Sequence, residues 1–150
     1  MRQISFIIAL LTFFVTSAQG VRKSQEELKE KAQAEINALE IELDSKTELS
    51  IDEFLNNRTE ADSTKFREKV YENYADLVRM FPKSENFSRY LYCKGKWTSN
   101  NDKAKDCFKK VIEINKWQYY VGKSYMRLSY FAIKEKDFAT ALQYLEIAER

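Results

Sequence analysis

The chain has 150 residues, and its 25 Lys and Arg against 23 Asp and Glu give a formal net charge of +2. It has no His and only 2 Cys, which excludes the usual four-ligand zinc sites and any mechanism that depends on an imidazole. With 3 Gly and 1 Pro, a turn-rich β-sandwich and a Gly-rich phosphate loop are disfavoured. We therefore expect no metal, no cofactor and no catalytic activity.

Residues 1–20 have the three-part layout of a secretory signal peptide. Arg2 gives a positive start, residues 4–15 are mostly apolar, and residues 16–18 are the small residues that a signal peptidase accepts. The apolar stretch is well short of the ~20 residues that a membrane-spanning helix needs. We expect cleavage after Ala18, or after Gly20, and a mature protein that is periplasmic or secreted and does not span a membrane. An uncleaved membrane anchor is the alternative.

Residues 21–62 form a charged region in which acidic residues outnumber basic ones. Apolar residues recur in it at steps of three and four, which line one face of a helix: Leu28, Ala32, Ile36, Leu39 and Leu43. We expect an amphipathic helix that packs on or caps the rest of the chain, with a short coiled coil as the alternative. Ser50 and Glu53 have capping-box spacing, which predicts a separate short helix over residues 51–57. Residues 56–64 are polar and predict a loop.

The rest of the sequence predicts helices over residues 66–81, 84–97, 102–115, 119–134 and 138–150. Pro82 ends the first of them because proline cannot donate a backbone hydrogen bond. Ser84 is expected to cap the second, and the charged residues 135–137 form a turn between the last two. No segment alternates with a period of two for long enough to predict a strand, so the predicted fold class is all-α.

Three of these helices share a pattern in which a small or branched residue is followed by large apolar ones. Val70, Tyr74 and Leu77 are matched about 34 residues later by Ala104, Phe108 and Val111, and Ala141 and Leu145 begin a third copy. The pattern resembles the tetratricopeptide repeat, a helix pair with small residues at close contacts. The last copy matches best, because Tyr125, Leu128, Ser129 and Ala132 occupy the positions of the family's first-helix motif.

The resemblance implies a short right-handed solenoid of stacked antiparallel helix pairs over residues 63–150. It assigns repeat packing to Val70, Tyr74, Leu77, Leu91, Ala104, Phe108, Leu128, Ser129, Phe138, Ala141 and Leu145. One helix pair cannot bury its apolar face alone, so stacking on neighbours is required. Another all-α bundle remains the alternative fold.

In the register of the repeat, the first helix of each pair lines a concave face. Residues on that face would form a basic groove with an apolar floor: Arg89, Lys96, Trp97, Lys123, Met126, Tyr130 and Lys134. Such a groove suits an acidic peptide or an acidic segment of another protein. Basic and aromatic residues together are also typical of nucleic-acid binding. We expect no nucleic acid here, because the aromatic residues fit a core and the lysines fit solvated helix faces.

Cys93 and Cys107 are the only thiols. In an exported protein, two cysteines favour a disulfide, and the repeat register places them on the two helices of the middle pair. The alternative is two buried free thiols, which behave as small apolar residues.

The predicted function is that of an exported helical-repeat adaptor that binds another protein. The last helix pair has no polar cap in the sequence. We therefore expect that the exposed end of the stack can pair with another copy of the chain or with a separate protein. A structural subunit of a cell-envelope assembly, completed by a partner at that last helix, is the first alternative. A carrier of small molecules is the second.

Overall fold

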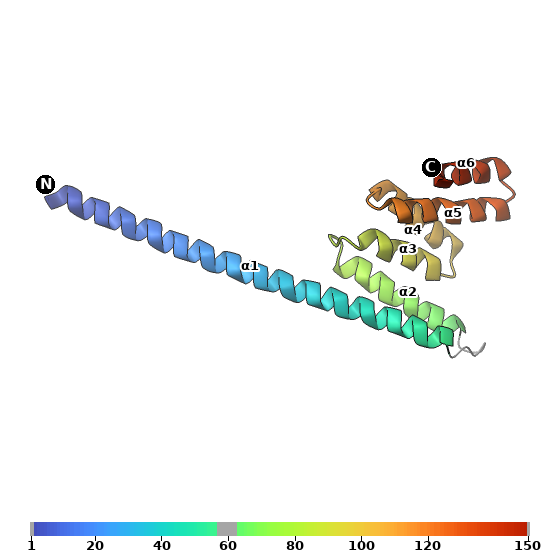
Figure 1. The fold of residues 1–150 in the computed structure, drawn as a ribbon, viewed down its shortest axis with the longest axis horizontal. Helices are drawn as coiled ribbons and strands as arrows, with labels where there is room; N and C mark the ends of the chain where they lie inside the picture. The colour runs from blue at the N-terminus through green and yellow to red at the C-terminus, as the bar shows by residue number, and fades with distance from the viewer. Residues whose placement is uncertain (1, 57–62, 150) are drawn as a thin grey trace. The chain divides into compact units, whose positions relative to one another are not determined.

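The computed structural model describes residues 2–56 and 63–149, with the side chains of residues 22, 25–56 and 64–149. The described residues form six helices and no strand, which confirms the all-α class (Figure 1). The helices are α1 (Arg2–Asn56), α2 (Ser63–Met80), α3 (Phe87–Trp97), α4 (Asn101–Ile114), α5 (Gln118–Lys134) and α6 (Phe138–Glu149). The loop predicted over residues 56–64 lies mostly outside the described residues.

The chain divides into two units, Met1–Ile41 and Glu42–Arg150, and α1 contributes to both. In the first unit, Leu28, Ile36 and Leu39 of the predicted apolar face are 67%, 47% and 42% exposed. The predicted signal peptide falls on residues whose side chains are not described, so its cleavage stays a prediction. No helix in the described ranges has both the length and the apolar character needed to cross a membrane.

The separate short helix predicted after Ser50 is wrong, because α1 continues through this position to Asn56. A helix-capping serine must lie outside the helix and accept a hydrogen bond. The Ser50 hydroxyl instead donates to the Lys46 carbonyl over 2.8 Å, and Thr47 donates to the Leu43 carbonyl in the same way. These bonds back to the preceding turn keep both side chains within one continuous helix.

The remaining helices begin and end close to the predicted positions. α2 ends at Met80, before Pro82. Ser84 does not cap α3: its hydroxyl accepts the Asn86 N–H and so stabilises the preceding turn, and Asn86 takes the capping position. Asn115 ends α4 in the left-handed conformation, at φ 48°, which asparagine tolerates better than most residues.

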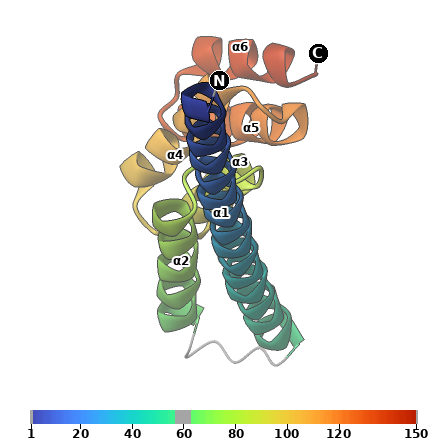
Figure 2. The same cartoon turned by 90° about the vertical axis from the view of Figure 1, so that its left-hand side faces the viewer.

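In the second unit each helix from α2 to α6 packs against the next, and α3 also contacts α5. Figures 1 and 2 show α2 at one end of this succession and α6 at the other. Two buried clusters hold it together. The first cluster comprises Val70, Tyr74, Leu77, Phe81 and Tyr90. The second cluster comprises Leu91, Tyr92, Ala104, Phe108, Val111 and Leu128.

The last part of α1 belongs to this packing, since Leu43 and Ile51 contact the first cluster. Phe54 of α1 stacks on Phe66 of α2 with ring centroids 3.8 Å apart. Residues 42–56 of α1 therefore pack against α2 and the first cluster.

Most of the residues assigned to repeat packing are buried: Val70, Tyr74, Leu77, Leu91, Ala104, Phe108, Leu128, Ser129 and Ala141. Two differ from the prediction, because Phe138 is 66% exposed and Leu145 is 43% exposed. Both lie on α6, which packs against α5 alone among the described helices. Their face of α6 therefore has no neighbour in the described structure.

Candidate functional site

The two faces of α5 differ sharply in burial. Val121, Ser124, Leu128, Ser129 and Ala132 are buried against the neighbouring helices. The hydroxyls of the two buried serines are hydrogen-bonded. Ser124 donates to the Tyr120 carbonyl over 2.7 Å, and Ser129 donates to the Met126 carbonyl over 2.8 Å. Their small size and satisfied hydroxyls let adjacent helices pack closely.

The opposite face of α5 carries a row of aromatic, apolar and basic side chains at helical spacing, which we name the α5 stripe. Its members are Tyr119, Lys123, Met126, Tyr130, Ile133 and Lys134. Tyr119 is 63% exposed, Met126 57%, Tyr130 50% and Ile133 46%. Scattered apolar side chains are normal on a surface, but a contiguous row of large ones marks an interaction site.

Each lysine of the α5 stripe lies over a tyrosine ring. The Lys123 ammonium is 4.1 Å from the Tyr119 ring centroid and also donates to the Tyr119 hydroxyl. The Lys134 ammonium is 4.7 Å from the Tyr130 centroid. The hydrogen bond to Tyr119 raises the pKa of Lys123 above its ordinary value, so this ammonium group stays charged at neutral pH. The rings hold the two charges in place along the helix.

The predicted groove is therefore brought together only in part. Lys123, Met126, Tyr130 and Lys134 share the α5 stripe. Lys96 of α3 lies over the Trp97 ring at 5.5 Å, but Trp97 itself packs on the first cluster, edge-on to Phe66 at 5.9 Å. Trp97 thus serves mainly as a core residue.

Arg89 is engaged within the chain, so it is not open to a peptide. Its guanidinium pairs with Asp44 and, at 3.3 Å, with Glu48 of α1, and the Tyr74 hydroxyl donates to the same Glu48 oxygen over 2.6 Å. Burial alone lowers the pKa of Arg89, but the adjacent Asp44 carboxylate raises it above its ordinary value. Burial is the main cause that raises the pKa of Tyr74, with Cys93 and Glu48 adding to it.

Cys93 and Cys107 are free thiols, so the unpaired alternative describes the structure. Cys107 lies against Gly95, since a Cβ placed on Gly95 would approach the Cys107 Cβ to 2.9 Å. Cys93 is two residues before Gly95 and so points about 200° around α3 from it, where its thiol contacts Tyr74. Burial raises the pKa of both thiols, which makes them poor nucleophiles.

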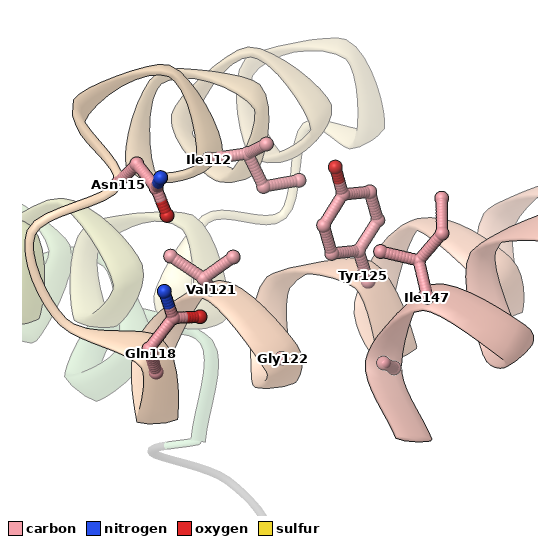
Figure 3. Close-up of a pocket in the computed structure, with 8 residues that line it drawn as sticks. Ile112, Asn115, Gln118, Val121, Gly122, Tyr125 and Ile147 are labelled. Atoms are coloured by element: carbon pink, nitrogen blue, oxygen red, sulfur yellow. The ribbon is translucent and has the colours of Figure 1, made fainter. Parts of the chain in front are cut away.

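A cavity of about 570 Å³ opens between α4, α5 and α6. Asn115 and Gln118 lie at one end of it, and Tyr125 and Ile147 lie at the other (Figure 3). Within the described ranges, no group of three or more Cys, Asp or Glu is placed to hold a metal ion.

Sequence reasoning missed Tyr119 as a member of the stripe, and it missed the cluster around Arg89. A local signal existed for Tyr119, because Tyr119–Lys123 and Tyr130–Lys134 have the same spacing of four residues. Comparison of the chain with protein-family models, with curated proteins and with solved structures finds no match.

Proposed function

We propose that this chain is an exported helical-repeat adaptor that binds another protein through the α5 stripe and carries out no chemistry of its own. The observation that carries the proposal is the stripe itself. It presents two positioned ammonium groups and four exposed apolar or aromatic side chains on one helix face. Aromatic residues in such rows are typical anchors of protein interfaces.

The packing supports a stack of three helix pairs similar to tetratricopeptide repeats: residues 42–56 of α1 with α2, α3 with α4, and α5 with α6. The contact between α3 and α5 joins the first helices of two successive pairs. Small residues also lie at close approaches, since a Cβ on Gly95 of α3 would lie 2.9 Å from the Cys107 Cβ of α4. A stack of this kind supplies extended binding surface.

Export is supported by the layout of residues 1–20. Intact-mass measurement of the protein recovered from the extracytoplasmic fraction tests it. We expect the mass to correspond to a chain that begins after Ala18 or after Gly20. A mass that retains Met1 in that fraction would overturn cleavage.

The partner is sought by photocrosslinking in the native cell. A benzoylphenylalanine replaces Met126 at the centre of the α5 stripe, and a matched control places it at Lys109, an exposed position of α4. We expect one discrete crosslinked protein from Met126 and none from Lys109. In the Lys123→Glu/Lys134→Glu background the crosslink should disappear, whereas in Lys109→Glu/Lys110→Glu it should remain. A crosslink that is absent from the Met126 position altogether would refute the adaptor function of the stripe.

A structural subunit is the second candidate, and the exposed row on α6 favours it. Phe138, Leu142 and Leu145 are 66%, 59% and 43% exposed and follow one another at helical spacing. If the protein is a subunit, a crosslinker at Leu142 should capture a stable partner that co-purifies in a fixed ratio, independently of the charges at Lys123 and Lys134.

A further inference from the structure

Among the described residues of the second unit, four cations lie over tyrosine rings: Arg89, Lys94, Lys123 and Lys134. Arg89 and the two lysines of the α5 stripe differ in what faces them. Arg89 lies over Tyr90 at 5.0 Å, much as Lys123 lies over Tyr119 and Lys134 over Tyr130. The first of these pairs is covered by another helix of the chain. It therefore provides an internal example of what this kind of surface accepts.

The covering helix is residues 42–56 of α1, and it is both acidic and amphipathic. Leu43 and Ile51 contact the first cluster. Asp44 and Glu48, one turn apart beside that apolar row, pair with Arg89. One helix face thus supplies apolar side chains to the aromatic surface and carboxylates to the cation.

The α5 stripe also has cations over tyrosine rings beside apolar side chains, but no described helix covers it. Among the described residues, neither Lys123 nor Lys134 has a carboxylate within ion-pair distance, although other lysines such as Lys105 do. Met126 and Ile133, 57% and 46% exposed, lie between the two lysines along the helix. The lysines are separated by three helical turns, or about 16 Å.

We propose that the α5 stripe binds an acidic amphipathic helix of a partner protein, with two carboxylates about three turns apart and apolar side chains between them. This inference rests on the proposed function and names the partner's chemistry. The carboxylates meet Lys123 and Lys134, while the apolar residues cover Met126 and Ile133. A nucleic-acid backbone would satisfy the lysines but would leave these two apolar side chains without cover.

The test uses the mature protein and a designed, fluorescein-labelled helical peptide of about 18 residues. Two glutamates lie three turns apart on one face with two leucines between them, in a polar alanine and glutamine background. One control peptide has the same composition but carries its leucines on the opposite face. A second replaces both glutamates with lysine. Binding is followed by fluorescence anisotropy at low and physiological salt.

We expect the acidic helix to bind at least about tenfold more tightly than either control peptide. Lys123→Glu/Lys134→Glu should lose this binding by about tenfold or more and gain binding to the lysine peptide. The matched Lys109→Glu/Lys110→Glu variant should stay within about twofold of the unmodified protein. The gain for the lysine peptide shows that the reversed variant is folded.

Equal binding of all three peptides, or unchanged binding by Lys123→Glu/Lys134→Glu, would overturn the proposal. So would tighter binding of a single-stranded oligonucleotide, or of a peptide that copies residues 25–41 of this chain, which would assign the stripe to a second copy. A discrete partner crosslinked at Met126 together with any of these results would leave the adaptor function standing and remove only the acidic helix.

Discussion

α4 and α6 each follow a helix against which they pack, yet they are buried to very different extents. α4 is rich in lysine and aspartate, but it buries Ala104, Cys107, Phe108 and Val111. α6 is the more apolar sequence, but it buries only Ala141. The difference follows from the neighbours: α4 packs against both α3 and α5, whereas α6 packs against α5 alone among the described helices. Burial is thus set by how many helices surround a segment, and apolar content alone does not decide it.

The largest expected effect is a difference in the free energy of unfolding between alanine substitutions at two phenylalanines. Phe108 of α4 is 1% exposed and Phe138 of α6 is 66% exposed. Phe108→Ala leaves a cavity in the second cluster and should lower the free energy of unfolding by about 3–5 kcal/mol. Phe138→Ala should change it by less than about 0.5 kcal/mol. Urea denaturation followed by circular dichroism measures both, and similar losses for the two variants would contradict the comparison.

The next test uses two helical glycines. Gly95 faces α4, where an added Cβ would lie 2.9 Å from Cys107 and 3.0 Å from the Phe108 ring. Gly95→Ala should therefore destabilise by about 1–2 kcal/mol after the gain in helix propensity is deducted. Gly122 faces α6, where the nearest atom is 3.6 Å away, so Gly122→Ala should stabilise by up to about 1 kcal/mol. Thermal unfolding should show a lower melting temperature for Gly95→Ala and a higher one for Gly122→Ala than for the unmodified protein.

A smaller effect is expected at the helix cap of α4. The Asn100 side chain accepts the Lys103 N–H over 2.9 Å. Asn100→Ala should cost about 1 kcal/mol, and Asn100→Asp, which keeps the acceptor, should cost much less. Equal losses in the same urea titration would mean that the cap bond contributes nothing.

The smallest effect concerns pH at the start of α6. The Thr140 hydroxyl and backbone N–H donate to Asp137 and hold the pKa of this carboxyl below its ordinary value. A lowered folded-state pKa contributes stability above the ordinary pKa, and this contribution is lost as the pH falls through the folded-state value, below about pH 4. Hydrogen-exchange protection of α6 should drop on that acidification in the unmodified protein. Asp137→Asn should remove this step, and a step that persists in the variant would assign it to another group.

The sequence predicted the helices and most buried positions because both depend on local periodicity. Tyr74, Leu77 and Phe108 repeat at helical spacing, and Pro82 and Asn115 stand at helix ends. Continuity of α1 through Ser50 was missed, because a serine hydroxyl can either cap a helix or donate to a carbonyl within one, and the spacing of Ser50 and Glu53 does not distinguish the two.

The site was predicted less completely than the fold. The lysines of the α5 stripe were found because they share a face with Met126 and Tyr130. The engagement of Arg89 was missed because Asp44 and Glu48 lie 45 and 41 residues away in sequence, and no local pattern joins them. The exposure of Phe138 was missed for a related reason: its spacing is that of a packing residue, but none of the described helices covers it.

Two small side chains connect the two buried clusters, because Val78 and Cys93 pack against both of them. In a linear stack, the coupling between neighbouring units determines whether the whole array melts in one step. Val78 and Cys93 therefore contribute directly to the coupling between the two clusters. Trp97 packs on the first cluster, so its fluorescence in a Trp117→Phe background reports whether that cluster melts together with the rest of the helices or before them.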